Sequence, residues 1–168
     1  MPWKKFGKLK DDQLLIKQKN DTFSIFSKEE DHPIIIVEKK LASAKGEFRF
    51  RSGKENVYLG KLLKDYPILK SYTLFDPKDK KIADISFYKG NPIGMKVLIE
   101  VEENRQIQAT TIDAGKSFDF KDKEGNIVFT VDKRTLDIRD SFIVKTYEPM
   151  EAFILAAITI AIDDFFHP

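Results

Sequence analysis

The sequence predicts a mainly β protein, a closed barrel of twelve antiparallel strands made of hairpin repeats around one central hydrophobic C-terminal helix. Two observations lead to this prediction. Alternating apolar segments recur at steps of 23 to 25 residues between positions 23 and 142, and a fixed period of this size is typical of a repeated supersecondary unit. The segment 152–162 contains one polar residue, Thr159, and no charge, so a helix formed there must be buried on every side.

The strands are expected in a regular order along the chain. The first lies at 13–18, where Leu14 and Ile16 alternate with polar residues. Five units follow, and each has two alternating apolar segments on either side of a polar turn, which predicts a β-hairpin. These units open at Phe23, Phe48, Tyr72, Met95 and Phe118. A last strand at 141–147 brings the total to twelve.

Twelve antiparallel strands can pack as two sheets or close into a barrel that has no exposed edges. The apolar helix, expected at about 150–164, favours the barrel, because a barrel of more than about eight strands needs something besides its own side chains inside. Asp163 and Asp164 are unfavourable at the negative end of the helix dipole. We therefore expect lysines at the barrel rim to offset them, or the helix to end before them.

Composition limits the classes of function. The 29 basic and 27 acidic residues leave a formal net charge of +2, so no strong field attracts nucleic acid. The absence of cysteine excludes disulfides and thiolate chemistry. The N-terminus lacks the apolar stretch of a secretory signal, and the run at 152–162 is shorter than the ~20 apolar residues of a membrane span. We expect a cytoplasmic protein, at most peripheral to a membrane, with no transmembrane segment.

A length of 168 residues fits one domain, expected at 13–168 after a basic segment at 1–12. Trp3, Phe6 and Leu9 lie three apart among lysines in that segment. At helical spacing they would form a basic amphipathic helix on a membrane surface. Alternatively, the segment is a frayed terminus whose aromatic side chains cover one end of the domain.

Three stretches resemble the LURP-one-related family, which belongs to the tubby C-terminal-like group together with the phospholipid scramblases. They are LLIKQK at 14–19 followed by Phe23-Ser24-Ile25, the turn from Asp122 to Asn126, and the ending LAAITIAIDDFFHP at 155–168. The resemblance covers about 14–168; the ending is its most specific part, and the middle matches only in pattern.

The resemblance implies a twelve-stranded barrel around a central C-terminal helix. The biochemical role of that family is largely unsettled, and its plant members are linked to defence responses. Tubby domains bind phosphoinositide headgroups through basic residues on the barrel wall. Scramblases also carry palmitoylated cysteines, and this chain has none, so that property does not carry over.

A candidate site for an anionic headgroup lies in the first half of the chain. Arg49 and Arg51 alternate with Phe48 and Phe50, so both arginines project outward if the aromatic side chains face inward. Planar guanidinium groups bind phosphate oxygens in pairs. The site is expected to consist of Arg49, Arg51, Lys61, Lys39 and Lys40. The alternative is a solvated face whose cations are balanced by interleaved carboxylates such as Glu47 and Glu55.

Catalytic and cofactor signatures are missing from the sequence. The two histidines, His32 and His167, are far apart in the chain, and there is no phosphate-binding glycine loop. The glycine of 122–126 comes too early for a calcium loop, so this stretch is expected to be a hairpin turn. We expect no enzyme, cofactor or metal site, and a module that binds an anionic phospholipid or another protein.

Two other functions remain open at this point. The first is a carrier of a small apolar ligand in the barrel mouth, since wide barrels hold ligands; a void beside Ala156 and Ala157 would favour it. The second is an enzyme that uses Asp163 and Asp164 in a cleft, although neighbouring residues on a helix point in different directions.

Overall fold

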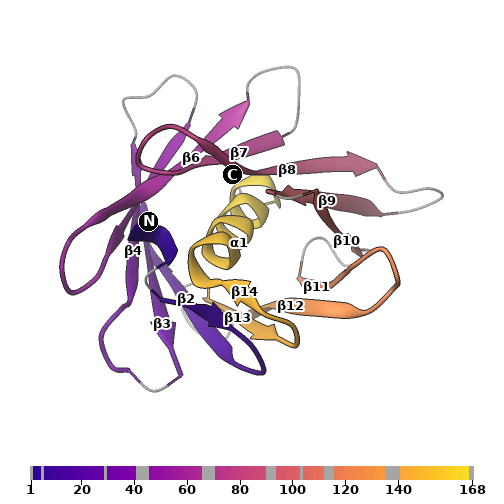
Figure 1. Cartoon of the computed structure of the whole chain (residues 1–168), viewed down its shortest axis with the longest axis horizontal. Coiled ribbons are helices and arrows are strands. Elements are labelled where there is room, and N and C mark those ends of the chain that lie inside the picture. The colour runs from indigo at the N-terminus through magenta and orange to yellow at the C-terminus, as the bar shows by residue number, and fades with distance from the viewer. Residues whose placement is uncertain are drawn as a thin grey trace.

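The computed structural model describes residues 2–4, 6–28, 30–40, 46–65, 71–89, 94–102, 104–111, 116–134 and 141–166. Twelve antiparallel strands close into a barrel, and a single α-helix runs through its middle (Figure 1). Around the barrel the strands follow one another in chain order, from β2 to β13, and β13 closes onto β2. The predicted fold class and strand number are therefore confirmed.

The barrel strands follow the predicted hairpin units. Their bounds are β2 Gln13–Lys19, β3 Thr22–Ser27, β4 Ile35–Lys40, β5 Glu47–Ser52, β6 Tyr58–Asp65, β7 Ser71–Phe75, β8 Lys81–Lys89, β9 Met95–Val101, β10 Arg105–Thr111, β11 Ser117–Lys121, β12 Ile127–Arg134 and β13 Ser141–Thr146. Alternate residues face the interior, as the period of two requires, and their apolar side chains are almost completely buried.

The central helix α1 spans Ala152–Phe166, and every residue from Ala152 to Asp163 is buried. Its one hydroxyl inside this run, Thr159 Oγ1, donates to the carbonyl of Leu155 at 2.9 Å, so that polar group needs no partner from the wall. Ala156 and Ala157 have no exposed surface. The helix thus fills the interior that twelve strands would otherwise leave empty.

The helix, predicted at about 150–164, is shifted by two residues at each end. Met150–Glu151 form a short strand, β14, which pairs with β1 (Lys8–Leu9) outside the barrel. At the other end the helix continues past Asp163 and Asp164 to Phe166. The local sequence does not reveal the pairing of β1 with β14, because the two strands lie at opposite ends of the chain.

The N-terminal residues cover the barrel end at which α1 begins. Pro2–Lys4 form a 3₁₀ turn, η1, and the indole of Trp3 is 3 % exposed, with its ring 5.9 Å from that of Phe153. Phe6 and Leu9 pack against the same core. Of the two alternatives for this segment, the one that places its aromatic side chains over the barrel end is observed. The fraying expected with it is not, because Lys8–Leu9 pair with Met150–Glu151.

Pairing between neighbouring strands is uneven around the barrel. Eleven of the twelve neighbour pairs share four to seven residue pairs. Between β10 and β11 the described residues form a single pair, Gln108 with Lys121. We call this boundary the β10–β11 seam.

None of the helices in the described part of the chain has both the length and the apolarity to cross a membrane.

Candidate binding surfaces

The predicted basic residues lie mostly on the outer face of β4, β5 and β6. Phe48 and Phe50 are buried, so Arg49 and Arg51 point outward from β5 as predicted. Lys61 of β6 lies directly opposite Arg49 in the strand register, and Lys40 is exposed at the end of β4. We call the outer face formed by Lys40, Arg49, Arg51 and Lys61 the arginine wall.

Carboxylates accompany the cations of the arginine wall. Arg49 Nε lies 2.7 Å from Glu47 Oε2, Arg51 Nη2 lies 3.2 Å from Glu38 Oε1, and Lys61 Nζ lies 3.2 Å from Asp79 Oδ1. The hydrogen bond and charge of Glu47 raise the pKa of Arg49 above its ordinary value. These pairs are partly or largely exposed, and such surface pairs contribute only about 0 to 1 kcal/mol each.

A shallow hollow of about 170 Å³ opens on the arginine wall. The guanidinium carbon of Arg49 lies 5.9 Å from the centre of the Tyr58 ring, which is 37 % exposed. The hollow is lined by Glu38, Lys40, Arg49, Phe50, Arg51, Asn56 and Tyr58. Three cations and one carboxylate thus surround a space open to solvent.

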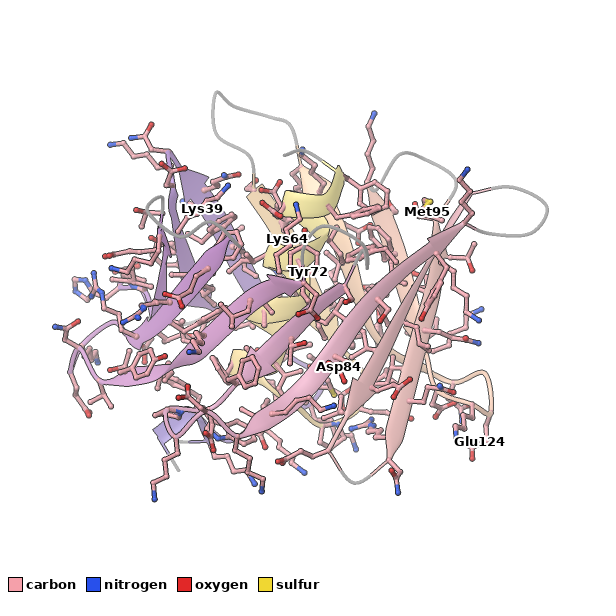
Figure 2. All side chains as sticks on the ribbon, turned by 90° about the horizontal axis from the view of Figure 1, so that it is seen from above. Lys39, Lys64, Tyr72, Asp84, Met95 and Glu124 are labelled. Carbon is pink, nitrogen blue, oxygen red and sulfur yellow. The ribbon has the colours of Figure 1, made fainter. Side chains whose placement is uncertain are left out.

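Lys39 does not lie with the other predicted residues. It occupies an inward position at the end of β4, and its Nζ lies 3.6 Å from Asp164 Oδ1 near the C-terminal end of α1. Lys64 Nζ lies 3.4 Å from Asp164 Oδ2, and the Tyr72 hydroxyl donates to the same oxygen at 2.5 Å. Figure 2 shows Lys39, Lys64 and Tyr72 gathered beside this end of the helix. The expectation that rim lysines offset the helix-end carboxylates is confirmed for Asp164.

Burial and the hydrogen bond to Asp164 strongly raise the pKa of the Tyr72 hydroxyl. The phenol therefore stays a donor to Asp164 over the physiological pH range. The cluster of Asp164, Lys39, Lys64 and Tyr72 fastens the negative end of α1 to strands β4, β6 and β7, where cations are favourable.

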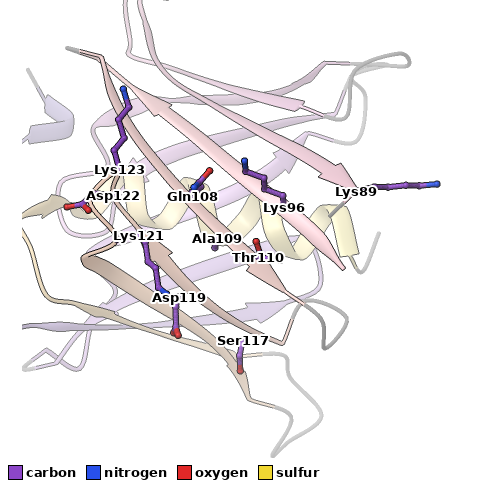
Figure 3. Close-up of a pocket in the computed structure, with 11 residues that line it drawn as sticks. Lys89, Lys96, Gln108, Ala109, Thr110, Ser117, Asp119, Lys121, Asp122 and Lys123 are labelled. Atoms are coloured by element: carbon purple, nitrogen blue, oxygen red, sulfur yellow. The ribbon is translucent and has the colours of Figure 1, made fainter. Parts of the chain in front are cut away.

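A second hollow, of about 700 Å³, opens at the β10–β11 seam on the opposite side of the barrel. It is lined by Lys89, Lys96, Gln108, Ala109, Thr110, Ser117, Asp119, Lys121, Asp122, Lys123 and Gly125. We call this space the lysine hollow. Figure 3 shows Lys96 and Lys121 on the two sides of the seam, with Lys123 above them and Lys89 directed away from the rest.

The lysines of the lysine hollow differ from those of the arginine wall in their contacts. Within the described residues, none of Lys89, Lys96, Lys121 and Lys123 forms an ion pair. Asp122 is occupied in its own turn, where its Oδ1 accepts hydrogen bonds from the backbone N–H groups of Glu124 at 3.0 Å and Asn126 at 2.9 Å. The predicted hairpin turn at 122–126 is therefore confirmed, and the lysine hollow keeps an excess of positive charge.

The lysine hollow was not predicted from the sequence. Lys121 and Lys123 belong to one hairpin, whose charged turn was predicted. Lys96 comes from β9 and reaches the same face because Thr110 of β10 pairs with it. The alternation of β9 and β10 predicts that Lys96 and Thr110 face outward, but no local signal indicates that β10 and β11 share a single residue pair beside them.

A third hollow, of about 340 Å³, lies at the barrel mouth beside Trp3. It combines apolar side chains such as Met150 and Ile154 with the charged residues Lys4, Lys8, Glu102, Arg105 and Glu151. Burial raises the pKa of Glu151, while the charges of Lys8 and Lys4 act in the opposite direction. Neither Ala156 nor Ala157 lines this hollow, the lysine hollow or the hollow of the arginine wall.

Among the described residues, no group of three or more His, Asp or Glu side chains is arranged to hold a metal ion. His32 is exposed in the connection between β3 and β4, and His167 lies outside the described residues. Asp163 is buried, whereas Asp164 is partly exposed in the cluster with Lys39, Lys64 and Tyr72.

No family model matches the chain, and no curated protein matches its sequence. Among solved structures, the chain is similar to the X-ray structure of a protein from Arabidopsis thaliana. The two share 12 % sequence identity with a TM-score of 0.65, and the match covers 92 % of each chain. At this identity the match shows a common fold over nearly the whole length.

Proposed function

We propose that this protein is a LURP-one-related, tubby-like module that acts by binding rather than by catalysis, and that its arginine wall binds anionic phospholipid headgroups. The fold shared with the Arabidopsis protein supports the resemblance at the level of architecture. The observation that carries the headgroup proposal is the placement of Arg49 and Arg51 on one outward face, with Lys61 opposite Arg49.

The ion pairs of the arginine wall are compatible with this role. Glu47 and Glu38 hold the two arginines at the surface, but exposed pairs of this kind are worth only about 0 to 1 kcal/mol each. A phosphate group can accept two hydrogen bonds from one guanidinium, so it can replace a carboxylate at small cost. Binding should then be weak for a single headgroup and strongly dependent on salt.

Membrane binding would raise the effective strength of these contacts. A negatively charged bilayer contributes about 1 kcal/mol for each Lys or Arg near its surface. Lys40, Arg49, Arg51 and Lys61 share one face of the barrel, so all four can approach a flat surface together. The proposed compartment is the cytoplasm, with peripheral and reversible attachment to the membrane.

The test is co-sedimentation of the full chain with phosphatidylcholine vesicles, with and without phosphatidylserine or a phosphoinositide, at low and physiological salt. We expect salt-sensitive binding to the anionic vesicles alone. The variant Arg49→Glu/Arg51→Glu should weaken this binding by at least about thirtyfold, from the loss of two such contacts. Lys17→Glu/Lys145→Glu, with the same change in charge on exposed positions of β2 and β13, is the matched control. Equal binding of the two variants would disprove the arginine wall as the site.

The carrier function keeps one observation in its favour, the hollow at the barrel mouth beside Trp3. Five charged side chains line this hollow, which suits an amphipathic ligand better than a purely apolar one. The interior itself is filled by α1, whose buried face reaches from Ala152 to Asp163. Headgroup binding on the outer wall therefore remains the better supported proposal.

A further inference from the structure

The hollow beside Trp3 lies where three distant parts of the chain meet. The first is the N-terminal segment, the second is the β9–β10 hairpin, and the third is β14 with the start of α1. We call this space the mouth hollow. Its volume of about 340 Å³ is within the ~300 to 1,000 Å³ of ordinary ligand sites, so it is large enough for a small molecule.

Glu151 is a buried carboxylate that lines the mouth hollow. The residue is 7 % exposed, and within the described residues its carboxylate neither accepts a hydrogen bond nor forms an ion pair. Burial raises the pKa of Glu151 above its ordinary value, as expected for a carboxylate that has lost water without gaining a hydrogen-bond donor. Such a group is costly to leave unsatisfied. A ligand that donates a hydrogen bond to Glu151 would therefore recover part of this cost.

Two lysines of the mouth hollow also lack an ion-pair partner in the part of the chain that the structure describes. Lys8 lies directly opposite Glu151 in the β1–β14 ladder, and directly opposite residues share one face of a ladder. The charges of Lys8 and Lys4 oppose the rise that burial causes in the pKa of Glu151, yet neither forms an ion pair with it. Lys4 Nζ lies 4.9 Å from the centre of the Trp3 ring. One carboxylate and two ammonium groups thus border a single space.

The other two charged residues of the mouth hollow are already paired. Arg105 Nη1 donates to the carbonyl of Pro149 at 3.3 Å, and its Nη2 lies 3.3 Å from Glu148 Oε2. Glu102 Oε1 lies 3.4 Å from Lys80 Nζ. The charges left for a ligand are therefore those of Glu151 and the two lysines.

A ligand with one sign of charge would fit the mouth hollow poorly. An ammonium group alone would approach Lys4 and Lys8, and an anion alone would approach the buried Glu151. Like charges at close range are unfavourable. A zwitterion satisfies both kinds of group at once. Met150 and Ile154 line the same space, so the ligand also has apolar surface to cover.

We propose that the mouth hollow binds a small zwitterion with an apolar side chain, of the class of the free apolar amino acids. The ammonium group of the ligand donates hydrogen bonds to Glu151. Its carboxylate faces Lys4 and Lys8, and its side chain lies against Trp3 and Met150. The site is independent of the arginine wall. Because the N-terminal segment forms one side of it, a bound ligand also fastens that segment to the start of α1.

The test follows the fluorescence of Trp3, the only tryptophan of the chain, which lines the mouth hollow. The probes are leucine, phenylalanine and three molecules that each lack one part of leucine. Isoamylamine lacks the carboxylate, isocaproate lacks the ammonium group, and glycine lacks the apolar side chain. Isothermal titration calorimetry measures the same affinities independently. All of these measurements use the unaltered protein, so they do not depend on the folding of a variant.

We expect leucine and phenylalanine to bind, and each of the three reduced probes to bind about tenfold or more weakly, because each leaves part of the site unsatisfied. Glu151→Gln should weaken leucine binding by a similar factor. The matched control is Glu124→Gln, the same change at an exposed position of the turn at 122–126, and it should bind leucine normally. Arg49→Glu/Arg51→Glu should also bind leucine normally, which separates this site from the arginine wall.

Each part of the proposal has an outcome that would overturn it. No change in fluorescence and no heat with leucine and phenylalanine would overturn the site. Equal binding of leucine and either isoamylamine or isocaproate would overturn the choice of a zwitterion, and equal affinity of Glu151→Gln and Glu124→Gln would overturn the role of Glu151. Phosphatidylethanolamine carries the same two kinds of charge, so a response to vesicles that contain it, without a response to the amino acids, would overturn the choice of a free ligand.

Discussion

The arginine wall and the lysine hollow lie on opposite sides of one barrel, and each contains four basic side chains. Over β4, β5 and β6 the strands are fully paired, and three of the four cations have a carboxylate partner. At the β10–β11 seam a single residue pair joins the strands, and the lysines have no such partner within the described residues. The two surfaces therefore have the same number of basic residues but differ in how many of these residues have a carboxylate partner.

The two sides also hold the central helix differently. Asp164 is bound by Lys39, Lys64 and Tyr72, from strands on the same side as the arginine wall. On the side of the seam, the end of α1 meets the sheet through aromatic rings, Phe166 against Phe118. Directional polar contacts fix one side of the barrel to the helix.

The largest expected difference in stability is between two Gly→Ala substitutions, one on each side of the barrel. Gly60 of β6 has a φ of +143°, and a Cβ placed there would meet the carbonyl oxygen of Phe75 at 2.1 Å and the Phe153 ring at 2.8 Å. Gly125, in the turn after β11, has a φ of +87° and nothing within 4 Å. Gly60→Ala should lower the free energy of unfolding by about 3 to 5 kcal/mol, as backbone strain and overpacking add.

Gly125→Ala carries only the cost of its positive φ, about 1 to 2 kcal/mol. Urea denaturation of both variants and the unaltered protein measures the two values. Similar losses would mean that the paired wall adjusts as readily as the turn beside the lysine hollow, and the contrast between the two sides would fail.

An intermediate effect is expected from the polar contact at the helix end. Tyr72→Phe removes the hydrogen bond to Asp164 and should lower the free energy of unfolding by about 1.5 to 3 kcal/mol, because a charged acceptor is involved. The raised pKa of Tyr72 also gives a pH dependence. Above about pH 10 the unfolded chain loses this proton while the folded protein keeps it, so stability falls as the pH rises.

The decline in stability above about pH 10 should therefore be smaller in Tyr72→Phe than in the unaltered protein. Tyr88→Phe is the matched control, because Tyr88 is 51 % exposed on β8. Thermal unfolding followed by circular dichroism between neutral and alkaline pH separates the two variants. If both behave alike, the contact with Asp164 does not hold the helix end.

Most of the fold could be predicted because its signals are local. The period of 23 to 25 residues and the uncharged run at 152–162 indicate hairpins and a buried helix without knowledge of any contact. The same alternation that buries Phe48 and Phe50 turns Arg49 and Arg51 outward, so the core of the arginine wall was also predictable.

What could not be predicted depends on pairs of residues distant in the chain. The helix starts two residues late because Met150 and Glu151 pair with Leu9 and Lys8. Lys39 turns inward to Asp164, and this contact follows from where α1 ends inside the barrel. Prediction of the lysine hollow would have required two facts about strand pairing. One is the β9–β10 pairing that places Lys96 beside Thr110, and the other is the single residue pair between β10 and β11.

The smallest expected effect on stability comes from neutralising one cation on each side of the barrel, which tests whether these cations contribute differently to stability. Arg49→Gln removes the pair with Glu47 and should lower the free energy of unfolding by up to about 1 kcal/mol at low salt, and by less at high salt. Lys121→Gln removes a lysine that has no ion pair among the described residues, so stability should stay the same or rise slightly as repulsion within the lysine hollow falls. Urea denaturation at low and high salt compares the variants. A larger loss in Lys121→Gln than in Arg49→Gln would mean that Lys121 makes a stabilising contact within the fold, and the contrast between the cations of the two sides would then be wrong.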